Sequence, residues 1–240
     1  MVTPISVNKD LFDITLTDFN QQKVSLDIYR DKKLCIFMWA SWWVCRAQLP
    51  VWQKTYKELF TEDDSVEFLS IAMDAIYQDK VKHFHQSAKA EFTTLIDTDN
   101  SLSKLMGFKV VPNILLINSY GELEYWKFGK ADIRNSYYKN LLKTWLSGKK
   151  LNILPKDDFI NANNQNHQLS LGKFNEYVNK GRLEVNEVRE LELDNMIVRK
   201  QLWAKENPEK FYQGNIDSDW QKNNLEKGIW RIIFITQYNP

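Results

Sequence analysis

The sequence predicts an α/β sandwich with a mixed central sheet, followed by a small, mainly α-helical C-terminal region. Two apolar runs of strand length, residues 34–39 and 66–75, have the composition of central strands buried on both faces. A helical pattern follows each run, over residues 46–60 and 79–89. Strands that alternate with helices in this way, and end in a hairpin and a helix, are typical of a layered α/β domain.

Shorter patterns predict the other elements of this domain. Residues 11–26 alternate between apolar and polar side chains around a polar turn, which predicts a hairpin. Residues 102–129 contain a short helix and then a strand–turn–strand pattern, and residues 133–146 have the spacing of an amphipathic helix. Because proline disturbs the interior of a helix, we expect a kink at Pro50.

Composition divides the chain into three regions. Residues 1–148 form the α/β domain, residues 149–168 are a polar linker, and residues 169–240 are a helical extension. Within the extension, residues 169–200 resemble one tetratricopeptide-type helical hairpin, and a further helix is predicted over 196–205. One such hairpin cannot bury its apolar face alone. We therefore expect the C-terminal helices either to dock within the chain or to mediate contacts with other copies or partners.

Charge and apolar patterning exclude several classes of protein. The formal net charge is +1, which gives no electrostatic reason to bind nucleic acid or an anionic membrane. No apolar run approaches a membrane span, and the N-terminus has no run of signal-peptide length. We expect a cytoplasmic protein, or a periplasmic one if a targeting segment has been removed. Two cysteines are too few for a disulfide scaffold.

The segment WASWWVCRAQLP, residues 39–50, carries the chemistry. It resembles the active-site segment W-A-[ST]-W-C-x-x-C-R-x-E-L-P of thiol:disulfide oxidoreductases of the TlpA/ResA type, which are thioredoxin-like redoxins. The family's downstream V-P-x-x-x-L-I-[DN]-x-x-G pattern is similar to residues 111–121, with Pro112 at the position of the cis-proline. The resemblance covers about residues 11–146. It implies a thioredoxin-like three-layer sandwich, a protein thiol or disulfide as the partner, and no cofactor.

The spacing at the active site departs from this pattern. Between Trp42 and Arg46 the chain has three residues, Trp43-Val44-Cys45, where the family has four. The spacing resembles a subgroup with the motif W-A-x-x-U-G-C, in which U is selenocysteine and would correspond to Trp43. An indole cannot attack a disulfide, so exchange through an internal dithiol is excluded. Some genetic codes read the selenocysteine codon as tryptophan. Trp43 therefore has three possible origins: it is the natural residue, a product of such decoding, or an engineered substitution.

Cys45 is the candidate catalytic thiol, and Trp43 marks the position of the missing first nucleophile. Cys45 precedes a predicted helix and is followed by Arg46, and both features favour a thiolate. The alternative is that Cys45 is an inert residue packed beneath that helix, and both interpretations stay open. Cys35 lies within a buried strand and is expected in the core.

The resemblance also implies a substrate-binding set. We expect Trp42 and Trp43 on the surface, as an aromatic platform for a partner peptide, and Trp39 in the core. Gln48 stands where the family often has a glutamate that could handle protons. The predicted substrate-binding residues are Trp42, Arg46, Val111 and Pro112.

Three functions follow from these residues. The first is a thiol-disulfide oxidoreductase lineage in which only Cys45 remains as a redox thiol. The second is a non-catalytic binding module that kept the fold and lost the chemistry. The third, ranked lowest, is a one-cysteine peroxidase resembling peroxiredoxins, whose upstream proline and threonine are absent here. No metal site is expected, because His83 and His85 point away from each other on a helix.

Overall fold

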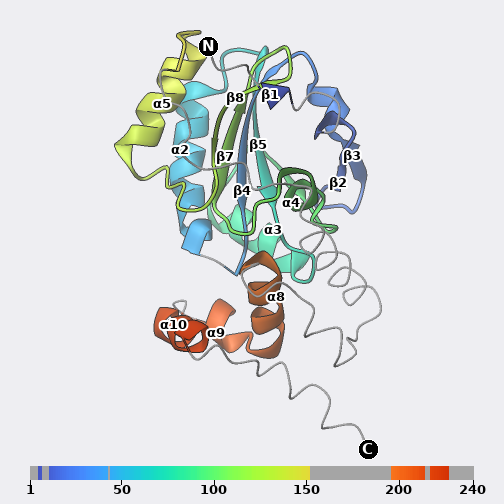
Figure 1. Ribbon diagram of the computed structural model, residues 1–240, viewed down its shortest axis with the longest axis vertical. Helices are drawn as coiled ribbons and strands as arrows, with labels where there is room; N and C mark the ends of the chain where they lie inside the picture. Colours follow the sequence, from blue (N-terminus) through green and yellow to red (C-terminus); the bar gives the residue numbers. More distant parts are fainter. Residues whose placement is uncertain (1–4, 7–10, 43, 152–195, 214–216, 227–240) are drawn as a thin grey trace, which may run out of the picture.

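The computed structural model describes residues 5–6, 11–42, 44–151, 196–213 and 217–226, in which eight strands form one mixed sheet. The strands are β1 (Ile5–Ser6), β2 (Thr15–Thr17), β3 (Lys23–Ser25), β4 (Lys33–Trp39), β5 (Val66–Ala72), β6 (Thr93–Ile96), β7 (Asn113–Ile117) and β8 (Glu122–Lys127). Their order in the sheet is β1-β8-β7-β4-β5-β6-β2-β3 (Figure 1).

Strand β4 lies at the centre of the sheet. It pairs in parallel with β5 and antiparallel with β7. Every residue from Leu34 to Trp39 is fully buried, because strands flank β4 on both sides and other elements cover both faces. The run of apolar residues predicted this burial, and the prediction is confirmed. Cys35, in the middle of β4, is a core residue as expected.

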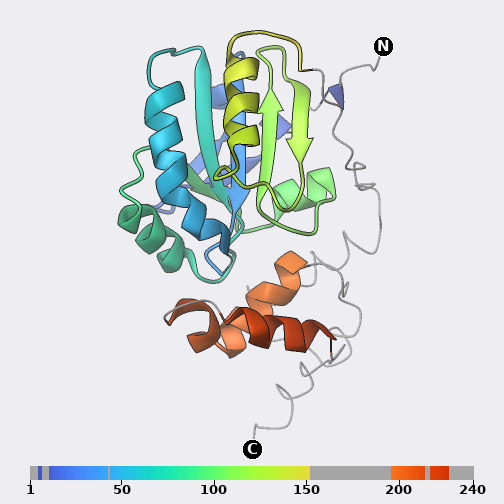
Figure 2. The same cartoon turned by 90° about the vertical axis from the view of Figure 1, so that its left-hand side faces the viewer.

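Helices cover both faces of the sheet. They are η1 (Leu26–Tyr29), η2 (Val44–Gln48), α2 (Leu49–Leu59), α3 (Gln78–Ser87), α4 (Ser101–Met106), α5 (Ser136–Leu146), α8 (Met196–Glu206), α9 (Glu209–Tyr212) and α10 (Ser218–Glu226). Helices α2 and α5 lie together on one face of the sheet, and α4 lies on the other face (Figures 1 and 2). The chain therefore has the thioredoxin-like three-layer sandwich with a mixed sheet that the sequence predicts.

Aromatic packing holds α2 against the central strands. The Trp52 ring lies 4.9 Å from that of Phe37 on β4 and 4.8 Å from that of Phe68 on β5, measured between ring centroids. Trp52 is fully buried. Large aromatic side chains dominate the stability of such a core. This contact fixes the start of α2, and with it the η2 turn that carries Cys45.

The predicted kink at Pro50 is wrong. Helix α2 begins at Leu49, so Pro50 lies in its first turn, and the preceding residues form the separate 3₁₀ turn η2. The first backbone N–H groups of a helix have no partner within the helix, so a residue without an N–H is tolerated there. The proline therefore marks the start of α2.

The C-terminal helices α8–α10 lie beyond the carboxyl ends of β4 and β5 (Figures 1 and 2). The helix predicted over residues 196–205 is present as α8. The predicted linker at 149–168 and the tetratricopeptide-like hairpin at 169–200 fall almost entirely outside the described residues. In the described part of the chain, every helix is too short or too polar to cross a membrane.

Candidate functional site

Two loops meet at the carboxyl edge of the central sheet. Because β4 and β5 are parallel, the residues that follow them lie at the same edge. Ser41 and Trp42 follow β4 and lead into η2, which carries Cys45. Strand β5 ends at Ala72, so Asp74 lies in the loop beyond it rather than in the strand that the sequence predicts.

The Cys45 side chain is fully buried beneath this edge. Its Sγ atom accepts a hydrogen bond from the Ala40 amide, with a sulfur–nitrogen distance of 3.1 Å. Burial raises the pKa of Cys45 to about 12, although the Ala40 amide and the Lys200 ammonium act in the opposite direction. Cys45 is therefore a neutral thiol at physiological pH. In this arrangement Cys45 is a packed, neutral thiol, and its reaction with a partner requires that the sulfur first become accessible.

The expectation that Trp42 lies on the surface is wrong. Its side chain is 1% exposed, and it belongs to the same buried cluster as Ile197, Trp203 and Phe211 of helices α8 and α9. The sequence could not indicate this, because these members of the cluster in α8 and α9 are more than a hundred positions away along the chain. Trp43 lies outside the described residues.

Arg46 is half-buried and makes contacts within the chain. Its Nη1 atom donates to Ser41 O at 3.1 Å and to Phe211 O at 2.9 Å. The guanidinium carbon lies 4.2 Å from the centroid of the Phe84 ring, a cation–π contact. Arg46 thereby joins the β4 loop, helix α3 and helix α9.

Asp74 is a buried carboxyl group that the sequence analysis missed. The Ser41 amide donates to Asp74 Oδ2 at 3.0 Å, and the Ser41 hydroxyl donates to Asp74 Oδ1. The same hydroxyl lies 3.2 Å from the Tyr212 OH of α9. Burial raises the pKa of Asp74 to about 7. An acidic residue near the end of the apolar run 66–75, at the edge where Cys45 is expected, was the signal that could have identified it.

Lys200 of α8 is the second ionisable group that the sequence analysis missed. It is 4% exposed, and its Nζ atom donates to Gln221 Oε1 of α10. Desolvation lowers the pKa of Lys200 to about 7, and Lys200 interacts electrostatically with Cys45. The pattern of α8 carried no signal for it, since residues around most of this helix are buried and no polar face stands out.

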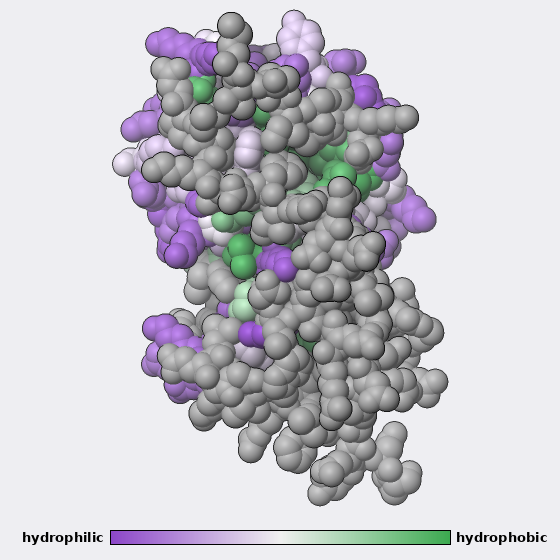
Figure 3. Space-filling view, in the orientation of Figure 1, coloured by the Kyte–Doolittle hydropathy of each residue, from purple (hydrophilic) through white to green (hydrophobic). Residues whose placement is uncertain are grey.

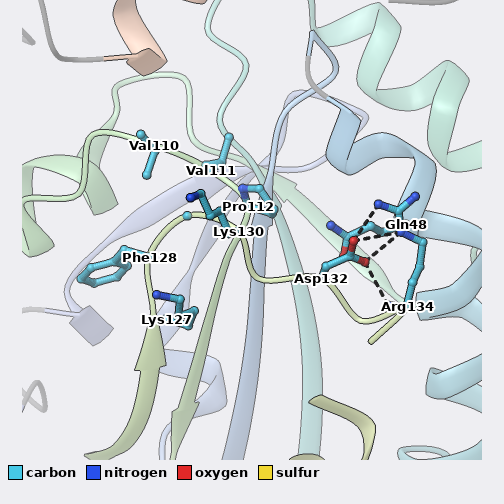
Figure 4. A pocket seen from close by; sticks show the side chains of 10 residues that line it. Gln48, Val110, Val111, Pro112, Lys127, Phe128, Lys130, Asp132 and Arg134 are labelled. Carbon is cyan, nitrogen blue, oxygen red and sulfur yellow. Dashed lines mark hydrogen bonds and ion pairs between the residues drawn. The ribbon is translucent and has the colours of Figure 1, made fainter. Parts of the chain in front are cut away.

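A cavity of about 600 Å³ lies beside the Val111–Pro112 peptide bond, which is cis. Figure 4 shows Val110, Val111 and Pro112 along one side of it, and the Asp132–Arg134 ion pair, with an N–O distance of 2.6 Å, at another. Its remaining lining residues are Gln48, Lys127, Phe128, Gly129 and Lys130. Of the predicted site residues, Val111 and Pro112 line this cavity, whereas Trp42, Cys45 and Arg46 do not.

Gln48 links η2 to the chain that follows β8. Its Nε2 atom donates to Ala131 O at 3.1 Å, and its Oε1 atom accepts from the Ile133 amide at 3.0 Å. A neutral amide can make both bonds, whereas an ionised glutamate could only accept. Gln48 therefore serves here as a buried bridge between two segments.

The chemistry of this site centres on sulfur. Cys45 can form a covalent bond to a partner, but only its thiolate is a strong nucleophile. In the described part of the chain, no group of three or more His, Cys, Asp or Glu residues is arranged to hold a metal ion.

Comparison with known proteins identifies one sequence family. The profile of the AhpC/TSA family matches residues 7–126. No curated protein sequence matches the chain.

Several solved structures are similar to part of the chain. A secreted disulfide oxidoreductase of Mycobacterium tuberculosis, homologous to E. coli DsbE, is 16% identical, with 58% of this chain and 98% of that chain covered and a TM-score of 0.49. StoA of Bacillus subtilis is 22% identical (53% and 95% covered, TM-score 0.43). A thioredoxin-like protein of Porphyromonas gingivalis is 16% identical (57% and 92% covered, TM-score 0.48). At these values none of them assigns an activity to this chain.

Proposed function

Because this chain belongs to the AhpC/TSA family, we propose that it is of thiol-disulfide oxidoreductase lineage and reacts with protein partners through one thiol, that of Cys45. The observation that supports this is the position of Cys45 in the turn after β4, with the Ala40 amide 3.1 Å from its sulfur. A hydrogen bond from an amide stabilises a thiolate. We also propose that the chain is of the TlpA/ResA type and that Trp43 occupies the position of selenocysteine in the W-A-x-x-U-G-C motif. Both points rest on the residues of segment 39–50.

The proposed reaction is exchange with a disulfide of a partner protein. The Cys45 thiolate attacks one sulfur, a Cys45–partner disulfide bond forms, and the partner's own disulfide bond breaks. The second partner sulfur leaves as a thiolate and takes up a proton. In this step the Cys45 sulfur is oxidised from the thiol to the disulfide level, the leaving partner sulfur is reduced from the disulfide to the thiol level, and the other partner sulfur stays in the mixed disulfide. Position 43 is a tryptophan and has no sulfur, so an external thiol has to release Cys45.

The cavity beside Pro112 is the proposed binding site for the partner's peptide. Val111 and Pro112 supply apolar contact, and the ammonium groups of Lys127 and Lys130 favour acidic side chains nearby. Of the other proposed substrate-binding residues, Trp42 is buried and Arg46 is hydrogen-bonded to Phe211 O of α9, so both would have to become exposed before they contacted a partner. We assign the exchange site to residues 1–148 and treat residues 169–240 as an accessory region.

The test is mixed-disulfide formation with an aromatic disulfide reagent, read by mass spectrometry of the intact protein. We expect one adduct, on Cys45, that is lost in Cys45→Ser and retained in Cys35→Ser. Trp43→Cys should restore a second thiol and give catalytic disulfide reductase activity that depends on Cys45. A folded Trp43→Cys variant without any such gain, in a protein whose Cys45 forms no adduct, would sink this proposal.

Burial favours a second candidate, a binding module without redox chemistry. Cys45 is fully buried and its pKa is raised to about 12, as expected for a thiol that has only a packing role. This candidate predicts a stable protein complex whose affinity is the same for the native chain and for Cys45→Ser. Peroxide consumption that disappears in Cys45→Ser would instead indicate the one-cysteine peroxidase.

A further inference from the structure

Helices α8–α10 are attached to the loops after β4 and β5 by specific hydrogen bonds. Gln201 Oε1 accepts from the Ala75 amide at 2.8 Å, and Tyr77 OH donates to Ala204 O at 3.3 Å. The ring of Tyr77 also lies 5.1 Å from that of Tyr212, edge to face. Two further bonds join Arg46 Nη1 to Phe211 O (2.9 Å) and the Ile197 amide to Lys109 O (3.2 Å).

Two of the contacts made by α8 and α9 involve residues at or beside Cys45. Arg46, the next residue along the chain, donates to Phe211 O of α9, and Lys200 of α8 interacts electrostatically with the Cys45 sulfur. Trp42 belongs to the same buried cluster as Ile197, Trp203 and Phe211. Thiol–disulfide exchange requires direct contact between the attacking and attacked sulfur atoms. Because Cys45 is fully buried, a partner disulfide cannot reach its sulfur in this arrangement.

The C-terminal helices bury polar side chains as well as apolar ones. Lys200, Gln201 and Gln221 are buried there, whereas the central strand β4 buries only apolar residues from Leu34 to Trp39. Hydrophobic and hydrophilic side chains lie next to one another where the two parts meet (Figure 3). Three buried donors have no hydrogen-bond partner among the described residues: Trp42 Nε1, Gln201 Nε2 and Gln221 Nε2.

The buried polar groups lower the free energy that is needed to open the seam between the C-terminal helices and the loops. A buried donor without an acceptor loses the hydrogen bond to water that it would make on exposure. Separation of the seam returns the Lys200 ammonium and these donors to water. Local opening in proteins concentrates in regions of this kind, and the core stays closed.

We propose that helices α8–α10 form a reversible cap, which occupies the protein-docking surface around Cys45 and frees the thiol when a partner protein takes its place. The cap rests on the proposed function, since it governs access to the same thiol. The cap contacts define the partner chemistry. A partner segment has to offer a main-chain carbonyl to Arg46, an amide oxygen to the Ala75 amide, and an aromatic ring to Tyr77.

The experiment measures alkylation of both cysteines in the full-length chain by mass spectrometry. Ala204 is fully buried in the seam, so Ala204→Glu introduces a carboxylate there and should release the cap. Gln213→Glu introduces the same carboxylate at an exposed position next to α9 and is the matched control. Cys35, in the core of the sheet, reports global unfolding.

We expect Cys45 to be alkylated about tenfold faster or more in Ala204→Glu than in the native chain, with Gln213→Glu unchanged and Cys35 protected in all three. If Cys45 is alkylated at the same rate in the native chain and in Ala204→Glu while Cys35 stays protected, the proposal of a cap is overturned. If both cysteines of Ala204→Glu are alkylated at similar rates, the variant has unfolded. Gln201→Ala, which removes the bond to the Ala75 amide, is then the variant that tests the cap. Faster Cys45 labelling in Gln201→Ala with Cys35 protected supports the cap, and an unchanged rate overturns it.

A second readout separates the cap from the proposed function. In Ala204→Glu, Cys45 is also treated with the aromatic disulfide reagent. Adduct formation supports both proposals. Fast alkylation without any disulfide adduct keeps the cap and overturns disulfide exchange as the function of the thiol.

Discussion

At the scale of single residues, burial sets the charge state of the groups around the site. Desolvation raises the pKa of Cys45 to about 12 and that of Asp74 to about 7, and it lowers the pKa of Lys200 to about 7. Each shift favours the neutral form, as expected where charge is costly. The site is therefore close to electrically neutral near pH 7 while the C-terminal helices are in place.

The Asp74 carboxyl group should make stability depend on pH. Its pKa is raised to about 7 in the folded chain and is about 3.9 when unfolded, so the folded state holds a proton that the unfolded state releases. This contribution to stability is complete below about pH 4 and is lost as the pH rises through about 7. We expect the free energy of unfolding to fall across this window, by at most about 1.4 kcal/mol per pH unit for this group.

Asp74→Asn should remove that part of the fall, and urea unfolding at a series of pH values measures it. Asp97 and Glu206, whose pKa values burial raises to about 6 and about 7, remain in the variant. The free energy of unfolding of Asp74→Asn should therefore still fall between about pH 4 and pH 7, but less steeply than that of the native chain. Parallel profiles of the two proteins above pH 6 would contradict the assignment.

At the scale of elements, the η2 turn is held from two directions. Trp52 anchors the following helix α2 to the sheet, and Gln48 ties the end of η2 to the segment after β8. Gln48 makes one bond as donor and one as acceptor, to Ala131 O and to the Ile133 amide. The position of Cys45 thus depends on contacts with strands and loops distant in sequence.

Gln48→Ala should lower the free energy of unfolding by about 1–3 kcal/mol, because it leaves a buried carbonyl and a buried amide without their partner. Chemical denaturation with a tryptophan fluorescence readout measures this change. Gln86→Ala is the matched control at an exposed position of α3, and should change the value by less than about 0.5 kcal/mol. Similar values for the two variants would mean that the Gln48 bridge adds nothing to stability.

At the scale of the whole molecule, the C-terminal helices and the thioredoxin-like fold share one buried cluster. Ile197, Trp203, Ala204 and Phe211 belong to the same hydrophobic cluster as the residues of the sheet. Arg46 is the polar link at the centre of this contact, because its guanidinium reaches both Ser41 O and Phe211 O. The planar guanidinium also stacks on Phe84, which an ammonium could not reproduce.

Arg46→Ala should loosen the C-terminal helices without loosening the sheet. We expect backbone amides of α8 and α9 to exchange hydrogen about tenfold faster, with those of β4 and β5 unchanged, since the lost bonds lie only at the seam. Hydrogen exchange measured by mass spectrometry tests this. Arg134→Ala removes an ion pair with Asp132 elsewhere and should leave α8 and α9 unchanged. If the backbone amides of α8 and α9 exchange hydrogen at the same rates in Arg46→Ala and in the native chain, the Arg46 contacts are not needed to hold these helices in place.

Local patterns in the chain were sufficient to predict a layered α/β domain, and the resemblance of residues 39–50 and 111–121 to the TlpA/ResA type implied its thioredoxin-like form. The apolar runs at 34–39 and 66–75 specify central strands because a run without polar residues can be buried on both faces. The segment at 39–50 identified the turn that carries Cys45, and Cys35 was placed correctly in the core. Each of these features depends on neighbouring residues and on the periods of helix and strand.

The state of the site was decided by contacts that no local pattern contains. Trp42 shares a buried cluster with Ile197 and Phe211, Lys200 interacts with Cys45, and the Ser41 hydroxyl that donates to Asp74 lies 3.2 Å from Tyr212 OH. These contacts exist because helices from the end of the chain pack against the loops after β4 and β5. The periodicity of apolar residues predicts which side chains are buried, but it does not predict which distant part of the chain packs against them. Desolvation depends on that surface, so the protonation and accessibility of Cys45 follow from the tertiary structure.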